Sequence, residues 1–232
     1  FEGGATGVQF TWTSPGPLTG LTATNSGTNE FRIFGTPTVN ITSNTTYEYQ
    51  IVTTGSECSP EITLTGSIEV KPDQALSLIS SATTANQVIC INDQVSLGSS
   101  FTSNFTPIEY QLGGGASGAT VSGLPPGIGF SITPSNTILI TGTAAAAATS
   151  IASPTVIYTY TVDTFGDCNV TQAVGTIEVH SLPVMSLTTS ASTANQTGLT
   201  DSVCVNTPIQ EINYRFEGGA TGVQFTWTSP GP

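Results

Sequence analysis

Residues 156–179 read VIYTYTVDTFGDCNVTQAVGTIEV, and this stretch decides the expected fold. On both sides of the turn around Gly166, apolar and polar side chains alternate with a period of two, which is typical of half-buried strands. Segments of the same character lie at residues 8–12, 47–52 and 62–70, separated by clusters of Gly, Pro, Asn and Ser. The sequence therefore predicts an antiparallel all-β protein.

A repeat is the strongest pattern in the chain. Residues 1–17 read FEGGATGVQFTWTSPGP, and residues 216–232 read the same seventeen letters. Residues 113–118, GGGASG, match the start of both copies more weakly, which gives an inner period of 104 to 111 residues. Further landmarks recur in the same order, including residues 66–70 (GSIEV) and 175–179 (GTIEV). Each copy is therefore expected to be one structural unit.

The expected unit boundaries follow two strand-like runs that end near a proline, at Pro72 and Pro183, because proline cannot donate to a sheet ladder. They give a unit at residues 1–72 that lacks its first strands, a complete unit at 73–182, and the start of the next unit at 183–232. Residues 183–232 followed by 18–72 would spell one whole unit. The chain is thus interpreted as a window of a tandem array.

A rival interpretation is a polymer of separate subunits that complete one another by strand donation. It must explain why both partners would carry the same seventeen residues, which would compete for one place.

Short strands, frequent turns and about 107 residues per unit predict immunoglobulin-like antiparallel β-sandwich domains in a linear array. A barrel and a β-solenoid remain alternatives. Ala144 to Ala148 is the one helix-prone run, and five residues are too few to nucleate a helix, so a loop is expected there. Trp12 and Trp227 occupy the same position in successive copies and are expected in the core, with ligand stacking as the alternative.

Composition narrows the possible partners. Three basic residues stand against fifteen acidic ones, and the net charge of -12 would repel both nucleic acid and an anionic lipid surface. No run of 18 apolar residues occurs, so no membrane insertion is expected. The chain opens without a Met or a basic leader, and it is interpreted as a mature product or an internal piece.

The chain has four cysteines, two for each expected unit, and no CxxC or Cys/His cluster that would suggest zinc. We expect an intradomain disulfide between Cys90, on an early strand, and Cys168, which follows the strand of residues 158–162. By the same logic Cys58 and Cys204 would each pair with the equivalent repeat copy outside the chain. Buried free thiols are the alternative. Paired cysteines imply an oxidising compartment.

The sequence offers no catalytic or cofactor-binding constellation, and no enzyme activity is expected. His180 is the one histidine, and it is interpreted as a solvated linker residue, because nothing supplies the acid and nucleophile of a triad. Residues 113–118 formally match GxGxxG, but a strand-like segment follows where a phosphate site needs a helix, so the glycines predict a tight turn. Calcium at domain junctions is kept as an alternative, although Asp163 and Asp167 only flank a hairpin.

The sequence contains candidate sites for N-linked glycans. Five asparagines begin an NxS/T sequon, which matters only in a host that modifies it: Asn40, Asn44, Asn104, Asn169 and Asn195.

Residues 124–128 (LPPGI) and 138–143 (ILITGT), followed by the strands on either side of the Gly-x-Cys turn at 166–168, resemble the Ig-like and PKD-like repeats of very large Bacteroidota surface proteins. The resemblance implies export to the cell surface, by the type IX route, and a role in adhesion, gliding or extracellular filaments. It also implies O-glycans at Asp-Ser/Thr-apolar sites, which Ser202 fits and Thr164 fits loosely.

The sequence thus predicts a structural segment of an extracellular adhesin stalk or surface filament that acts as a mechanical spacer. Its expected partners are neighbouring repeats of the same chain, or other copies in a filament. Two alternatives stay open: an adhesion module that binds a surface glycan, another ligand or a substratum, and a filament subunit that self-assembles by strand exchange.

Overall fold

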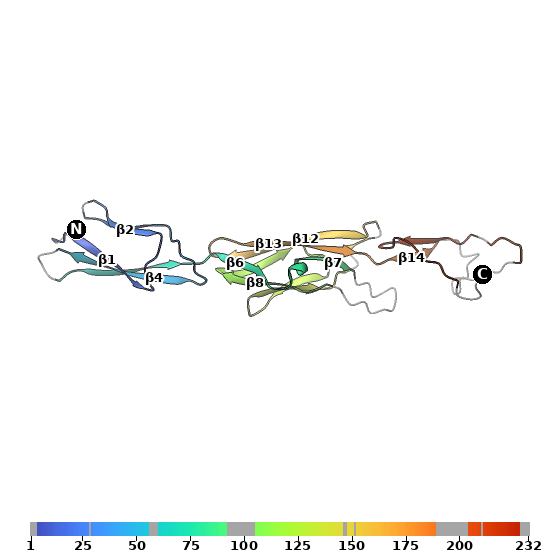
Figure 1. Cartoon of the computed structure of the whole chain (residues 1–232), viewed down its shortest axis with the longest axis horizontal. Coiled ribbons are helices and arrows are strands. Elements are labelled where there is room, and N and C mark those ends of the chain that lie inside the picture. Colours follow the sequence, from blue (N-terminus) through green and yellow to red (C-terminus); the bar gives the residue numbers. More distant parts are fainter. Residues whose placement is uncertain are drawn as a thin grey trace.

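The computed structural model describes residues 4–27, 29–55, 60–91, 105–145, 148–150, 152–188, 204–209 and 211–227. Three groups of strands follow one another along an elongated molecule, whose termini lie at opposite ends (Figure 1). The regular elements are β-strands and the short 3-10 helix η1 (Ala82–Ala85). All strand pairs are antiparallel except one, so the predicted all-β, antiparallel fold is confirmed.

The first group of strands lies in residues 7–70. Its three-stranded sheet has the order β1-β4-β5, with β1 (Gly7–Ser14), β4 (Thr45–Thr54) and β5 (Thr63–Val70). A separate hairpin pairs β2 (Leu21–Asn25) with β3 (Phe31–Gly35). Between them, Phe10 contacts the rings of Trp12, Phe31 and Tyr49 at centroid distances of 5.2 to 5.7 Å. Aromatic packing therefore holds this group together.

The central group is a two-sheet, immunoglobulin-like sandwich. One sheet has the order β10-β11-β8-β6 and the other β7-β13-β12-β9. The first comprises β6 (Gln74–Leu78), β8 (Ile108–Gly114), β10 (Ile128–Ile132) and β11 (Thr137–Gly142). The second comprises β7 (Asn86–Cys90), β9 (Ala116–Ser122), β12 (Thr155–Gly166) and β13 (Gln172–His180).

The core of the sandwich fills the space between these two sheets. Every second side chain of β8 and β11 is buried against every second side chain of β12 and β13, as the period-two pattern predicts. The innermost members have no exposed surface: Ile108, Ile138, Ile140, Tyr160, Val162, Ile177 and Val179.

The third group is the antiparallel pair of β14 (Val184–Leu187) and β15 (Tyr214–Glu217). Its register repeats that of β6 and β8. Leu187 opposes Tyr214 as Leu78 opposes Tyr110, and the pairs before them continue the match. The third group therefore carries strands of the β6 and β8 type.

The first group repeats strands β9 to β13 of the sandwich, with β1 to β5 in the same arrangement. Gly20 and Gly35, both with positive φ, meet backbone to backbone at the base of the β2–β3 hairpin, and Gly127 and Gly142 do the same for β10 and β11. In both places an added Cβ would come within 2.5 Å of the facing carbonyl oxygen, so glycine is required. The described part of the first group therefore has no counterparts of β6, β7 and β8, and the third group carries strands of the β6 and β8 type.

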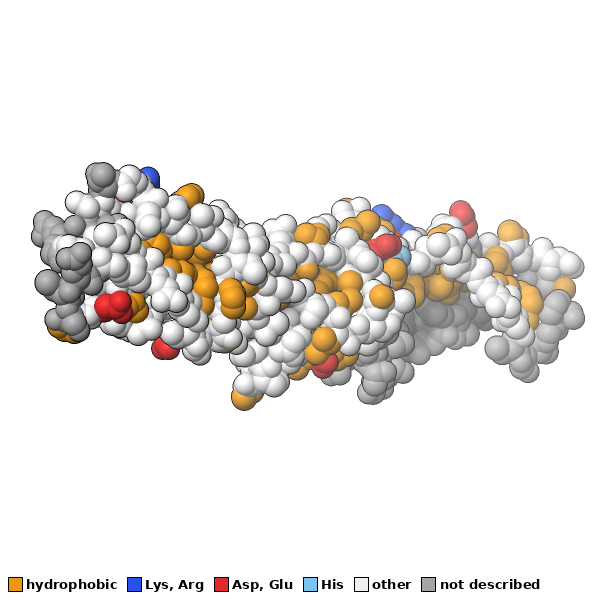
Figure 2. Space-filling view, turned by 60° about the vertical axis from the view of Figure 1, so that its left-hand side comes forward, with side chains coloured by type: hydrophobic (Ala, Val, Ile, Leu, Met, Phe, Trp, Pro, Cys, Tyr) orange, Lys and Arg blue, Asp and Glu red, His pale blue; other side chains and the backbone are white. Residues whose placement is uncertain are grey.

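This incompleteness corrects the expectation that both tryptophans are buried. Trp12 is half-buried in the aromatic cluster, whereas Trp227 is 65% exposed and contacts the ring of Phe225. The described first group lacks counterparts of β6, β7 and β8, and the described third group has counterparts of β6 and β8 alone, so neither forms a complete sandwich around its tryptophan. In Figure 2 hydrophobic side chains accordingly gather on the surface over the N-terminal strands. The alanine run gives a loop at Ala144 and Ala145, as predicted.

Candidate functional site

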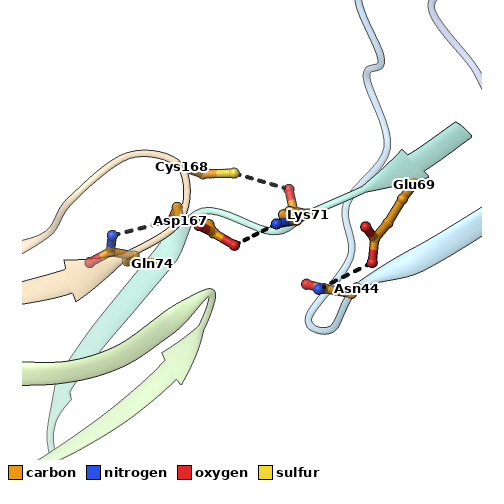
Figure 3. Close-up of polar contacts among 6 residues, drawn as sticks. All are labelled: Asn44, Glu69, Lys71, Gln74, Asp167 and Cys168. Atoms are coloured by element: carbon orange, nitrogen blue, oxygen red, sulfur yellow. Dashed lines mark hydrogen bonds and ion pairs between the residues drawn. The ribbon is translucent and has the colours of Figure 1, made fainter.

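The candidate functional site is the link between the first group and the sandwich. β5 ends at Val70 and β6 begins at Gln74, so Lys71, Pro72 and Asp73 alone connect them. Pro72 has no backbone N–H and stops the ladder at this point. The turn between β12 and β13, at residues 167–169, comes back from the sandwich and lies against the link (Figure 3).

Three successive residues of this turn contact the link. Lys71 Nζ lies 2.5 Å from Asp167 Oδ2, and this hydrogen bond raises the pKa of Lys71. The Cys168 thiol donates to the carbonyl oxygen of Lys71 at 3.7 Å. Asn169 Nδ2 donates to Asp73 Oδ1 at 2.9 Å. The ion pair is exposed, and exposed ion pairs contribute little to stability, so the turn is held by the whole set of contacts.

Gln74, the first residue of β6, is buried and binds the β12–β13 turn next to the link. Its side chain is only 4% exposed, and Nε2 donates to the carbonyl oxygen of Asp167 at 3.2 Å. Its backbone N–H donates to the Asn169 carbonyl at 3.1 Å, and Thr171 Oγ1 donates to the Gln74 carbonyl at 2.7 Å. Buried hydrogen bonds from both the side chain and the backbone of one residue cost more to break than an exposed ion pair. The C-terminal end of the link is therefore fixed to the sandwich by hydrogen bonds.

The glycine run at residues 113–118 also serves the link. Gly114 has a φ of 59°, and a Cβ there would lie 2.0 Å from the carbonyl oxygen of Asp73. Gly115 N–H donates to that same oxygen at 3.1 Å. The run is a tight turn between β8 and β9, as predicted, and its glycines allow the close approach of the link.

A hollow of about 440 Å³ lies beside the link, lined in part by Pro37, Asn40, Lys71 and Asp73. On its N-terminal side Asn44 Nδ2 donates to Glu69 Oε1 at 3.4 Å. No three His, Cys, Asp or Glu side chains of the described residues gather as a metal site would require. Calcium at the junction, the alternative that the sequence left open, is not tested.

The cysteines correct the disulfide prediction. Cys90, the last residue of β7, lies opposite His180, the last residue of β13. Cys168 precedes the other end of β13, which begins at Gln172. That strand is nine residues long and spans about 26 Å, whereas a disulfide requires Cα atoms within about 7 Å.

The predicted pairing of Cys90 with Cys168 is therefore wrong for this fold, and the structure contains no such bond. The reason is that β7 runs parallel to β13, so it ends far from the turn. Cys204 is exposed, and Cys58 lies outside the described residues. Their predicted pairing with other copies is not tested.

Two further predicted residues lie elsewhere than expected. Thr164 is 4% exposed, and its hydroxyl donates to the Thr171 carbonyl at 2.9 Å and accepts from the Thr171 N–H at 2.8 Å. A glycan has no access to it, while Ser202 lies outside the described residues. His180 ends β13 instead of lying in a linker, with Nε2 at 2.7 Å from Glu178 Oε1.

Sequence reasoning missed the roles of Asp73, Gln74 and Asn169. The one local signal was that the polar residues Asp73 and Gln74 directly follow the boundary proline Pro72. Their contact is between residues more than 90 positions apart, which no local pattern shows. Within the described part of the chain, no helix is long and apolar enough to cross a membrane.

Comparison with known proteins gives no family. No family model and no curated protein matches the chain. Among solved structures, human CDH23 EC21-23 is 13% identical with a TM-score of 0.42, over 91% of this chain and 69% of that one. The protocadherin GammaB4 extracellular domain is 13% identical with a TM-score of 0.39, over 78% and 28% respectively. This chain thus spans between 28% and 69% of the length of these two structures.

Proposed function

We propose that the chain is a structural segment of an extracellular stalk or surface filament, in which repeated sandwiches in series act as a mechanical spacer without catalysis. The observation that supports this most directly is the serial repetition of one strand arrangement, with the same register in β6–β8 and β14–β15. Repetition along one axis sets reach, and it gives each unit only its neighbours as partners.

The link supports the same proposal. A flexible tether would leave the direction of the next unit undefined, whereas Gln74 and Asn169 fasten this link to the sandwich. A fastened link transmits orientation from one unit to the next. The partners proposed for the chain are therefore neighbouring repeats of the same polypeptide, at the outside of a cell. Export by the type IX route and an origin in Bacteroidota belong to this proposal.

The experiment is force spectroscopy on several copies of residues 18–232 joined end to end. Because every unit would have its own core, stretching should give a regular series of unfolding events, two for each copy. A single event for each copy, or a featureless extension, would contradict independent units in series.

An adhesion module is the second candidate, and the exposed apolar side chains on the N-terminal strands favour it (Figure 2). Patches of this kind mark binding surfaces in other proteins. Saturable binding of residues 18–232 to a glycan array or to host surfaces would establish this function in place of the spacer.

A further inference from the structure

Cys168 and Cys90 lie beside equivalent residues at the ends of two successive units. Cys168 contacts the carbonyl of Lys71 at 3.7 Å, at the end of β5. Cys90 lies opposite His180, at the end of β13. The sequences GSIEV-Lys71 and GTIEV-His180 match position for position, and β5 and β13 pair in the same way with β4 and β12. Lys71 and His180 are therefore the same place in successive units.

The strand that ends in Cys90, β7, is one of the three strands without a counterpart in the described first group. In the sandwich, β7 covers the free edge of β13, whereas β5 has only β4 as a neighbour. Cys204 has the matching sequence position, because Val203 and Val205 flank it as Ile89 and Ile91 flank Cys90. A unit completed by such a strand would place its cysteine beside Lys71, where Cys168 already lies.

We propose that consecutive units are joined by a disulfide across the link, between the cysteine that ends the β7-type strand of one unit and the cysteine in the β12–β13 turn of the next. In this chain Cys168 takes the second role, and Cys90 and Cys204 take the first. This inference rests on the proposed tandem array, and it deepens it by assigning a covalent bond to each junction.

Accessibility and geometry support the bond. Cys90 and Cys168 are both exposed, and Cys90 points to the outer face because its neighbours Ile89 and Ile91 are buried. Cys168 has a φ of 62°, which is unusual for a residue with a side chain. The contacts of Asp167 and Asn169 hold it in that conformation against the link.

The chemistry is thiol–disulfide exchange with a disulfide donor of the extracellular space. One cysteine thiolate attacks the donor and releases one donor thiol. The second thiolate then attacks the mixed disulfide and releases the other. Two protein thiols lose two protons and two electrons, and the donor disulfide is reduced to two thiols. The bond would limit rotation about the link. A pulling force would then be carried by both the polypeptide backbone of the link and the disulfide.

The test extends the chain at its N-terminus with a copy of residues 183–215, because residues 1–17 then continue that copy as 216–232 do in the original. Replacement of the original Cys204 by Ser makes the added copy unique. The protein is oxidised with glutathione disulfide, its remaining thiols are alkylated, and the digest is mapped by mass spectrometry. We expect one linked peptide that joins the added cysteine to Cys168.

Two variants decide between this bond and a bond within one unit. In Cys168→Ser the link should disappear and the added cysteine should become alkylated, whereas in Cys58→Ser the link should persist. The opposite result, loss in Cys58→Ser and persistence in Cys168→Ser, would overturn the inference. Complete alkylation of the added cysteine in the extended protein that keeps Cys58 and Cys168 would also overturn the inference. Failure of the disulfide would leave the regular unfolding events expected for the spacer unchanged, so the two proposals fail separately.

Discussion

The hydroxyl groups of Tyr110 and Tyr160 lie 3.0 Å apart in the middle of the sandwich, where β8 of one sheet faces β12 of the other. Tyr160 also donates to the carbonyl oxygen of Ala85 at 3.2 Å, which leaves Tyr110 as the donor to Tyr160. Both rings are buried. One chain of hydrogen bonds therefore connects η1 to both sheets, and burial raises the pKa of Tyr160.

Replacement of Tyr160 by Phe tests this chain of bonds. The variant keeps the ring but leaves the Tyr110 hydroxyl and the Ala85 carbonyl without their partner. Unsatisfied buried groups cost about 1 to 3 kcal/mol, so the free energy of unfolding should fall by that amount. Urea unfolding followed by circular dichroism measures it. Tyr214→Phe is the matched control, because Tyr214 is half exposed, and an equal loss in both variants would contradict the argument.

Alkaline pH should weaken the sandwich for the same reason. The pKa of Tyr160 is raised above its ordinary value of 10.0, so its neutral form is favoured in the folded state. The stability that this gives is complete below pH 10 and is lost as the pH rises above that value, since only the unfolded chain then ionises readily. Urea midpoints at pH 8 to 11.5 should decline, and the decline should be shallower in Tyr160→Phe. An equal slope would show that another group is responsible.

The sequence predicted the strands well because their signal is local. Alternation in residues 156–162 and 175–179 follows from one buried face, and the structure contains both strands. Turn glycines such as Gly114 were predicted for the same reason. The disulfide was mispredicted because the parallel pairing of β7 with β13 is a long-range choice that residues 86–90 do not encode.

Gly175 should be irreplaceable even though it lies in a strand with ordinary backbone angles. A Cβ at this position would lie 2.2 Å from the Ala85 carbonyl oxygen and 2.4 Å from the Tyr160 hydroxyl. Gly175→Ala must therefore push η1 or Tyr160 away, and overpacking of this kind costs about 1 to 3 kcal/mol.

Gly129→Ala is the matched control in another strand, because no atom lies within 4 Å of its added Cβ. Thermal unfolding should show a clearly lower Tm for Gly175→Ala and a Tm within a few degrees of the parent for the control. A Gly175→Ala protein as stable as the parent would contradict the close approach.

Trp12 reports whether the first group can be completed by strands of the third-group type. The side chain is half-buried among Phe10, Tyr47 and Tyr49. A copy of residues 183–215 placed before Phe1 would supply counterparts of β6 and β8 and cover this cluster. In a Trp227→Phe background, Trp12 is the only fluorescent tryptophan. The extension should shift its emission to shorter wavelength and reduce its quenching by acrylamide.

The unextended chain separates the array from strand exchange between molecules. If separate chains donate strands to one another, Trp12 of the unextended protein should become protected as its concentration rises, together with an increase in sedimentation coefficient. If the missing strands come from the same polypeptide, protection should appear only in the extended chain and should not depend on concentration. Trp12 that is equally quenched in both proteins would contradict completion by either route, because a covered aromatic cluster excludes the quencher.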